Sequence, residues 1–381
     1  MLPAARASAT AVRRLASAAS EHAAETAATL CSAAAASGWS GPDIYDALGA
    51  RWPGVLVAGK RRRQALVQLH ARLPLDLRPL SRQTHRRIAK TLALFAMADQ
   101  RLAQLGLPDA GPRAERALDL LAVGAPAWGY PFDVQTRWSF YGQDSPNVVV
   151  TAFAINALAD GGRAEPAEAG ARWVHQQLYV DELGAYAYHP GDRTVIHNAN
   201  LLGARAAWMV RDADAGVRPA VARAVERTLA AQRPDGAFPY GEGPGLEWVD
   251  SFHTAYVLEC LTDLSEVDSA IRPAVERGAE YWRAHFFDER GRALLRPDRS
   301  FPEDAHSAGS ALTALVRLHA DGIGASDLIA RVAERAADAM VKGSHAIHRR
   351  YRWGPTRVRY VRWADGHVAL GLANAALAPR T

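Results

Sequence analysis

Residues 250–261 read DSFHTAYVLECL, one polar residue followed by a helix-length run of small and apolar side chains. The same plan recurs four more times, each time after a turn rich in glycine and aromatic residues. The five leading polar residues lie 51, 52, 54 and 61 positions apart, in the order Asn147, Asn198, Asp250, Asp304 and Asp365. A period of this length indicates a repeated supersecondary unit.

Amphipathic segments lie between these runs. They alternate Ala, Val and Leu with Arg and Glu, and they span residues 164–178, 216–232, 268–286 and 326–342. A run that is apolar nearly all round must be buried on both sides, whereas an amphipathic helix lies between a core and water. Each repeat is therefore predicted to be a hairpin of one inner and one outer helix.

The repeated hairpins predict an all-α fold, an α/α toroid of about six helix hairpins with negligible sheet. Residues 85–105 are expected to form a further inner helix, with its outer partner among the helices before it. An open superhelix of the tetratricopeptide type is the alternative, but its period of about 34 residues does not match the spacing.

The N-terminal 36 residues are rich in alanine and carry three arginines, as a transit peptide would. Glu21 and Glu25 interrupt that pattern, so we expect an Ala-rich helix that belongs to the fold. We expect residues 1–80 to be an N-terminal helical segment packed on the toroid or forming part of it. Residues 81–381 are then the toroid domain.

Composition places the chain among globular proteins. Hydrophobic residues make up 49% and charged residues 22%, and no charge-free apolar run approaches the roughly 18 residues of a membrane span. Two cysteines, Cys31 and Cys260, cannot build a disulfide framework. A reducing compartment fits best, and we expect a cytoplasmic protein.

The net charge of +5 is unevenly distributed, because residues 1–113 carry 16 Lys and Arg against 7 Asp and Glu. The basic residues include the run 60–63 (KRRR) and the pair 86–87. Neither is interleaved with aromatics or set in a nucleic-acid-binding motif, so no nucleic-acid partner is expected. A solvated helix face explains the charge, with peripheral association with an anionic membrane surface, an anionic polymer or a glycosyltransferase as the alternative.

In a toroid, all inner helices begin at one end, so the five leading polar residues gather at a single mouth. Asn and Asp are ordinary helix N-caps, which is the structural explanation for them. Capping does not account for the histidines, because His197, His253, His306 and His367 lie within three residues of these positions. Several imidazoles and carboxylates at one mouth indicate acid–base chemistry or polar-ligand binding.

Six segments carry a family resemblance: residues 128–138 (WGYPFDVQTRW), 145–153 (SPNVVVTAF), 195–204 (VIHNANLLGA), 232–243 (QRPDGAFPYGEG), 248–261 (WVDSFHTAYVLECL) and 301–315 (FPEDAHSAGSALTAL). They resemble bacterial α/α-toroid proteins of capsule and exopolysaccharide gene clusters, which contain prenyltransferase or squalene-cyclase-like repeats. In that family a Trp usually stands in place of Val134 and a Gly in place of Ala255. The resemblance implies a toroid fold and a role in building or tailoring a polysaccharide or related glycoconjugate.

The residues of the mouth suit acid–base chemistry on a saccharide, with an anionic one favoured. His253 is the expected base, oriented by Asp250 or Asp304, and Asp304, Glu247 or Tyr240 is the expected acid. His306 completes the catalytic group. Aromatic rings stack on sugar faces while caps and charged groups meet hydroxyls and anions. The expected substrate-binding residues are Trp128, Tyr130, Arg137, Asn147, His197, Asn198, Glu247, Trp248 and Asp365.

A zinc site is a weaker alternative. Asp250, His253, Asp304 and His306 offer nitrogen and oxygen ligands from two helix starts, but they lack close ligand spacing, and no cysteine joins them. We therefore expect no metal and no cofactor.

Three functional classes stay open. The first is a polysaccharide-tailoring lyase, epimerase or hydrolase. The second is a terpene-cyclase-like enzyme acting on an isoprenoid, although the acidic motifs Asp-x-Asp-Asp and Asp-Asp-x-x-Asp are absent. The third is a protein that binds a glycan or lipid-linked glycan, or that serves as a scaffold, without catalysis.

Overall fold

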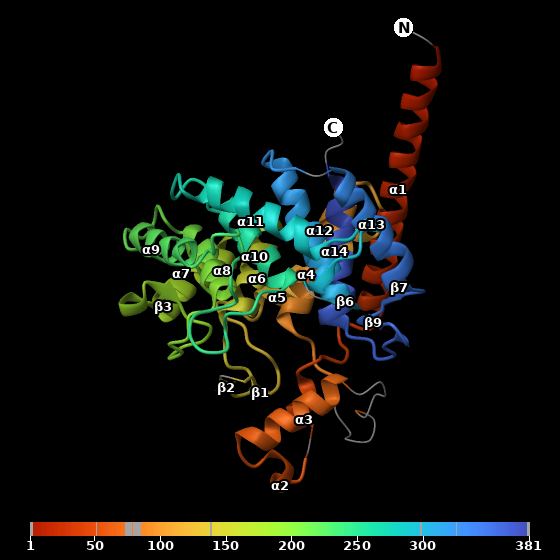
Figure 1. Ribbon diagram of the computed structural model, residues 1–381. Coiled ribbons are helices and arrows are strands. Elements are labelled where there is room, and N and C mark those ends of the chain that lie inside the picture. The colour runs from red at the N-terminus through yellow and green to blue at the C-terminus, as the bar shows by residue number, and fades with distance from the viewer. Residues whose placement is uncertain are drawn as a thin grey trace.

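The computed structural model describes residues 3–50, 52–72, 78, 85–137, 139–297, 299–324 and 326–378 (Figure 1). Six helices form an inner ring in which each contacts the next, and the last contacts the first. In chain order they are α4 (Ala89–Gln104), α6 (Val148–Asp160), α8 (His197–Trp208), α10 (Ser251–Asp263), α12 (Ala305–Ala320) and α14 (His367–Leu377). The ring is closed, and the predicted α/α toroid is confirmed.

Outer helices pack against this ring. They are α5 (Ala110–Ala122), α7 (Ala164–Leu178), α9 (Val217–Ala230), α11 (Ile271–Phe286), α13 (Ser326–Met340) and α1 (Pro3–Ala36). The outer helices are amphipathic, as α13 shows: its buried side chains recur every three or four residues from Leu328 to Met340. The inner helices are buried nearly all round, which the first eight residues of α6 illustrate. The predicted division into inner and outer helices is thus confirmed.

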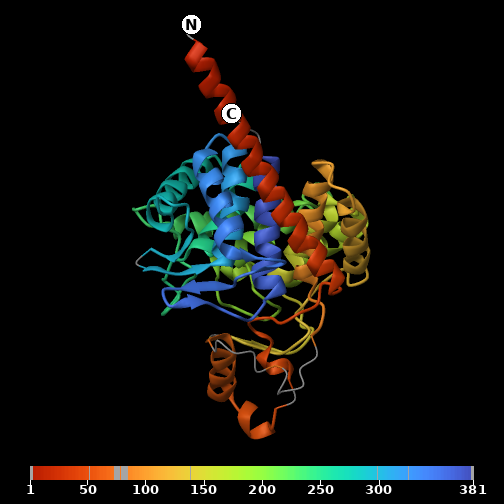
Figure 2. The ribbon, with the colours of Figure 1, turned by 90° about the vertical axis from the view of Figure 1, so that its right-hand side faces the viewer.

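Helix α1 is the outer helix where the two ends of the toroid meet. It runs along the side of the ring (Figure 2) and contacts α14, α13 and α4. Its buried stripe includes Ala27, Leu30 and Ala34. Inner helix α4 packs against α5, which follows it in the chain. The expectation that the outer partner of α4 would precede it is therefore incomplete, because sequence reasoning missed α5.

The polar residues that lead the repeats cap their helices in three of five cases. Side-chain oxygens of Asn147, Asp250 and Asp304 accept hydrogen bonds from backbone N–H groups three residues later. Asn198 instead lies inside the first turn of α8, and Asp365 lies in a π-helical turn (Val361–Gly366) before α14. The capping explanation is wrong for these two.

The loops between the helices contain short antiparallel strands, whereas negligible sheet was predicted. One sheet has four strands in the order β10 (Gly354–Pro355), β9 (Arg349–Tyr351), β6 (Arg299–Asp304) and β5 (Leu294–Arg296). Three two-stranded ribbons pair β1 (Val134–Gln135) with β2 (Phe140–Tyr141), β3 (Tyr179–Val180) with β4 (Ala185–Tyr186), and β7 (Val341–Lys342) with β8 (His345–Ala346). Two helices, α2 (Gly54–Val57) and α3 (Lys60–Arg72), lie outside the toroid. No helix among the described residues is long and apolar enough to cross a membrane.

Glycine allows α12 and α14 to touch. A Cβ atom on Gly309 would overlap the backbone carbonyl of His367, and one on Gly371 would meet the backbone of Gly309. The two helices therefore approach backbone to backbone at this point. Backbone cannot move aside as a flexible side chain can, so the inner ring closes here only with glycine.

We expect Gly309→Ala to lower the free energy of unfolding by at least about 2 kcal/mol, because the overlap outweighs the better helix propensity of alanine. Gly111→Ala in α5 is the matched control, because a Cβ there meets nothing within 4 Å. That variant should be unchanged or more stable by about 0.5–1 kcal/mol. Urea unfolding followed by circular dichroism measures both. Equal stability of the two variants would contradict the close approach of α12 and α14.

Candidate functional site

The inner helices begin at one end of the toroid, which we call the mouth. Three turns at the mouth are tied to the start of the preceding inner helix: Val148 N–H donates to Tyr188 O, His197 N–H to Tyr240 O and Ala305 N–H to His348 O. These bonds, of 2.9–3.0 Å, run from one repeat to its neighbour. The turns therefore form a connected rim.

Asp250 and His253 form a pair at the start of α10. The Nδ1 atom of His253 lies 2.9 Å from both carboxylate oxygens of Asp250, and Asp250 also accepts from the His253 backbone N–H. A carboxylate accepts hydrogen bonds, so the proton of a neutral imidazole sits on Nδ1 and leaves Nε2 with a lone pair. The His253 side chain is 19% exposed, whereas Asp250 is buried.

Two aromatic rings flank this imidazole. Tyr240 and Trp248 stack with centroids 4.2 Å apart, and His253 lies edge-on to them at 4.6 and 5.4 Å. A backbone hydrogen bond from Tyr240 N–H to Trp248 O, 2.8 Å long, fixes the turn that carries both rings. Burial raises the pKa of Tyr240, so its phenol keeps its proton at neutral pH and remains a hydrogen-bond donor. Tyr240, Trp248, Asp250 and His253 are the sequence-predicted residues that lie together.

A segment from the N-terminal part of the chain reaches the same mouth. Tyr45 packs edge-on against Trp363 at 5.5 Å, and Asp43 forms a buried ion pair with Arg362 at 2.5–2.8 Å. The Arg362 guanidinium also lies 5.1 Å from the rings of Tyr130 and Trp363. Sequence reasoning missed Asp43, Tyr45 and Arg362, because more than 300 residues separate the ion-pair partners. The available signal was weak: two aspartates, at 43 and 46, in a stretch that carries no Lys or Arg of its own.

Tyrosines continue the aromatic lining beyond Tyr130. The Tyr141 ring lies 6.5 Å from Tyr130 and 6.0 Å from Tyr188. Burial raises the pKa of all three phenols, so they remain protonated hydrogen-bonding groups. His189 stands next to them, with its Nε2 2.7 Å from the Ser139 hydroxyl.

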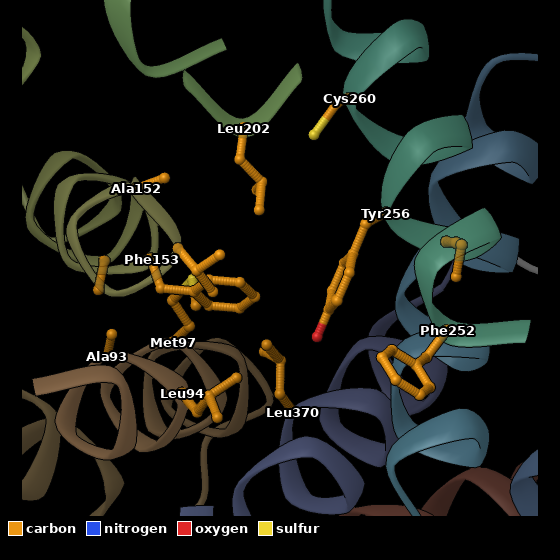
Figure 3. Close-up of a cluster of buried hydrophobic side chains, with 14 of the residues drawn as sticks. Ala93, Leu94, Met97, Ala152, Phe153, Leu202, Phe252, Tyr256, Cys260 and Leu370 are labelled. Carbon is orange, nitrogen blue, oxygen red and sulfur yellow. The ribbon is translucent and has the colours of Figure 1, made fainter. Parts of the chain in front are cut away.

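A second group of polar side chains lies beneath the mouth, around the axis of the ring. The imidazoles of His306 and His367 stack at 3.8 Å, and the Tyr256 hydroxyl lies 2.6 Å from His306 Nε2. Figure 3 shows Tyr256 among apolar side chains of the inner helices. Burial lowers the pKa of both imidazoles well below its usual value, so both are neutral at pH 7. Lys90 lies 4.0 Å above the Phe153 ring, and burial lowers its pKa as well.

One side chain, Phe252, contacts the imidazoles of both His253 and His306. Phe252 lies 4.1 Å from the His253 ring and stacks on His306 at 4.4 Å. His306 is buried beneath this phenylalanine, whereas His253 faces the mouth. Of the two predicted catalytic histidines, only His253 is partly exposed.

Asp304 and Asp365 are buried carboxylates that pair with partly exposed arginines. Asp304 lies 2.9 Å from Arg349 and 4.0 Å from His348, and it also caps α12. Asp365 accepts from Arg359 at 2.6 Å and from the Ala346 N–H at 2.7 Å. Burial raises the pKa of Asp365 to about 6. Both carboxylates hold loops of the mouth in place.

Four other predicted residues are buried in the protein. The Trp128 indole donates to Leu121 O at 3.1 Å, and Asn147 caps α6. His197 lies between α8 and α9, with Nδ1 3.3 Å from the Thr228 hydroxyl. Asn198 is buried, and its Oδ1 has no hydrogen-bond partner among the described residues.

Arg137 and Glu247 are exposed at the rim. The Arg137 guanidinium lies beside Gly245, in the loop that precedes Trp248. Glu247 contributes its backbone carbonyl to Arg233, which anchors the same loop. Arg137 therefore lies close in space to the loop that carries Trp248, and Glu247 is adjacent to Trp248 in the sequence.

The proposed zinc ligands do not form a cluster. Asp304 is paired with Arg349, and His306 with Tyr256, which leaves Asp250 and His253 as one pair. Across the part of the chain that the structure describes, no three His, Cys, Asp or Glu residues gather as metal ligands would.

No protein-family model and no curated protein matches the chain. Among solved structures, an unsaturated glucuronyl hydrolase specific for heparin is similar at 14% identity and a TM-score of 0.56, covering 77% of this chain and 88% of that one. A cellobiose 2-epimerase from Bacillus thermoamylovorans B4167 is similar at 11% and 0.59, covering 76% and 87%. A D-mannose isomerase gives 11% and 0.56, covering 76% and 86%. At such identities the similarity shows the fold, a six-hairpin α/α toroid.

The buried position of His197 predicts a specific loss of stability in acid. Burial lowers its pKa from 6.5 to about 4, so below about pH 6.5 the unfolded chain binds a proton that the folded protein does not. Stability is therefore lost as the pH falls, by about 2 kcal/mol at pH 5 from this residue alone. Asp99 and Asp365, whose pKa values are raised to about 6, act in the opposite direction.

A difference measurement isolates His197 from the aspartates. We expect the stability gap between the wild type and His197→Gln to shrink by about 2 kcal/mol between pH 7 and pH 5, measured by urea unfolding at each pH. His285→Gln, at an exposed site on α11, is the control and should show a constant gap. A gap at His197 that does not change with pH would show that this imidazole is accessible to solvent.

Proposed function

We propose that the mouth binds a saccharide and that His253, oriented by Asp250, transfers a proton to and from it. The observation that carries this proposal is the Asp250–His253 pair, whose imidazole faces the Tyr240–Trp248 stack. Asp250 fixes the ring and its tautomer, and Nε2 is left to accept a proton. Trp248 offers a flat apolar face of the kind on which sugar rings stack.

Tyr240 is the proposed proton donor. Its phenol stays protonated, it adjoins His253, and its turn is held by backbone hydrogen bonds. Asp304, the other acid considered from sequence, is buried against Arg349 and is a poorer donor. Arg137 at the rim suits a carboxylate or phosphate on the substrate, which favours an anionic saccharide.

A proton-transfer reaction fits these residues better than hydrolysis. Most glycoside hydrolases use two carboxyl groups that flank the scissile bond. Near His253, Asp250 is committed to the imidazole, and Glu247 is exposed at the rim. We therefore propose an epimerase, isomerase or lyase, in which a base removes a proton from carbon next to a carbonyl or carboxylate. Similar structures include an epimerase and an isomerase as well as glucuronyl hydrolases, so the choice of class rests on the residues around His253.

The biological setting is proposed to be the tailoring of a polysaccharide or glycoconjugate. Its support is the sequence resemblance of residues 195–204, 248–261 and 301–315 to toroid proteins of capsule gene clusters. The isoprenoid alternative has less support. A terpene cyclase uses aromatic faces to stabilise carbocations, but Lys90 already lies over the Phe153 and Tyr256 rings at the axis.

Solvent deuterium tests the proposed chemistry. The protein is incubated in D₂O with reducing disaccharides and uronate-containing oligosaccharides, and mass spectrometry follows deuterium uptake at carbon. We expect His253→Ala to lower the rate by about 100-fold or more, with Asp250→Asn and Tyr240→Phe also impaired, because each removes a part of the proton-transfer system. Calorimetry should show substrate affinity changed less than turnover.

His285→Ala on the outer helix α11 is the matched control and should exchange deuterium at the wild-type rate. Full exchange by His253→Ala would refute the proposed base. Binding without exchange, lost on Trp248→Ala but kept in His253→Ala, would instead identify a non-catalytic glycan-binding protein.

A further inference from the structure

The α2–α3 hairpin, residues 54–72, projects from the mouth end of the molecule, away from the N-terminus of α1 (Figures 1 and 2). It is anchored on the β1–β2 ribbon of the mouth. Arg63 Nε donates to Gln135 Oε1 and Gln64 Nε2 to Thr136 O, both at 2.9 Å. The Arg63 guanidinium also lies 4.4 Å from the centroid of the Phe140 ring. The hairpin therefore has a fixed position relative to the mouth.

The outward surface of this hairpin is basic. Residues 52–72 contain no Asp or Glu and carry the run KRRR at 60–63. Arg63 faces the ribbon, and Arg62 donates to the Val55 carbonyl at 2.7 Å. Lys60 and Arg61 are exposed, and neither forms an ion pair with another described residue. Most arginines of the outer helices, by contrast, are paired with nearby carboxylates.

Large aliphatic side chains are exposed next to these cations. Val55 is 63% exposed, Leu56 45% and Leu69 51%, and they make up three of the seven large hydrophobic residues that are exposed among the described residues. Phe140, on the ribbon that holds α3, is exposed as well. Exposed aliphatic groups next to basic residues are typical of a surface that contacts a partner or a membrane.

We infer that the α2–α3 hairpin docks the protein on an anionic lipid bilayer. Aliphatic side chains at the tip enter the boundary between headgroups and acyl chains, and Lys60 and Arg61 meet lipid phosphates. A nucleic acid would use the cations but would leave Val55 and Leu56 in water, so the bilayer accounts for more of the surface.

Docking through this hairpin turns the mouth toward the membrane, because the hairpin and the mouth share one end of the toroid. Together with the proposed function, on which this step rests, it identifies the substrate class as a lipid-linked saccharide. The sugar would be presented to His253 at the level of the headgroups. The docking itself does not depend on the chemistry.

Vesicle flotation without any substrate tests the docking. We expect the full-length protein to bind phosphatidylcholine vesicles that contain about 30% phosphatidylglycerol, and to bind less as NaCl rises from about 0.1 to about 0.5 M. Lys60→Gln/Arg61→Gln should weaken partitioning about 25-fold, because each cation contributes about fivefold. Val55→Ser/Leu56→Ser should weaken it about tenfold through the loss of apolar burial.

Matched controls separate the hairpin from charge and hydrophobicity in general. Arg116→Gln/Arg277→Gln removes two exposed cations without ion pairs to other described residues from α5 and α11, and Leu105→Ser changes an exposed leucine after α4, at the opposite end. Both should bind within about twofold of the wild type, because neither site faces the bilayer. Circular dichroism and the Tm of every variant should be unchanged, because all these side chains are exposed.

Absence of vesicle binding, or equal weakening by the controls, would overturn the proposal. Binding of a short RNA or DNA, measured by fluorescence anisotropy, without vesicle binding would assign the basic run to nucleic acid and would also overturn it. If docking holds, Lys60→Gln/Arg61→Gln should still exchange deuterium into a water-soluble saccharide at the wild-type rate. Failure of exchange in all variants, with vesicle binding intact, would refute the proposed chemistry alone.

Discussion

The backbone contact between α12 and α14 at Gly309 and Gly371 is the constraint on which the toroid depends. A closed ring of six helices has no free edge. The distance between any two neighbouring inner helices therefore limits the distances between the other pairs. Small residues on the inner helices, such as Ala152 and Ala311, keep the ring narrow and its interior filled. Because the ring closes, the starts of the inner helices lie at fixed positions around one rim. Helix packing therefore determines the geometry of the mouth.

Helix capping and chemistry use the same groups at this rim. Asp250 satisfies the exposed N–H groups of α10 and, with the same carboxylate, holds the His253 imidazole. Asp304 caps α12 in the same way, but its second oxygen meets Arg349 and secures the four-stranded sheet. The same capping aspartate thus has two different second roles. In α10 the second partner is the His253 imidazole, and in α12 it is the Arg349 guanidinium. A repeated fold can in this way place a reactive pair in one repeat and structural ion pairs in the others.

The sequence period was sufficient to predict the ring, because the inner and outer helices differ sharply in hydrophobic pattern. It could not predict which histidine faces the mouth. His253 lies three residues after its cap, and His306 and His367 lie two residues after Asp304 and Asp365. One residue corresponds to about 100° of rotation around a helix, so a difference of one position turns an imidazole from the rim toward the axis. The Asp43–Arg362 pair and the two-residue strands depend on contacts between distant segments, which no local pattern reveals.

The place of α1 in the outer ring has a consequence for biosynthesis. The apolar stripe of this helix, which includes Ala27 and Leu30, packs mainly on α14 and α13 and less on α4, so most of its partners are the last helices of the ring to be synthesised. During translation at about 5–20 residues per second, the emerging N-terminal helix waits many seconds for its binding surface. Hairpins between residues 89 and 340 can form in order as they leave the ribosome, but the ring cannot close before the final turn of α14 is released. The nascent chain therefore passes through an open, curved state with an exposed seam, the period in which chaperone protection matters most.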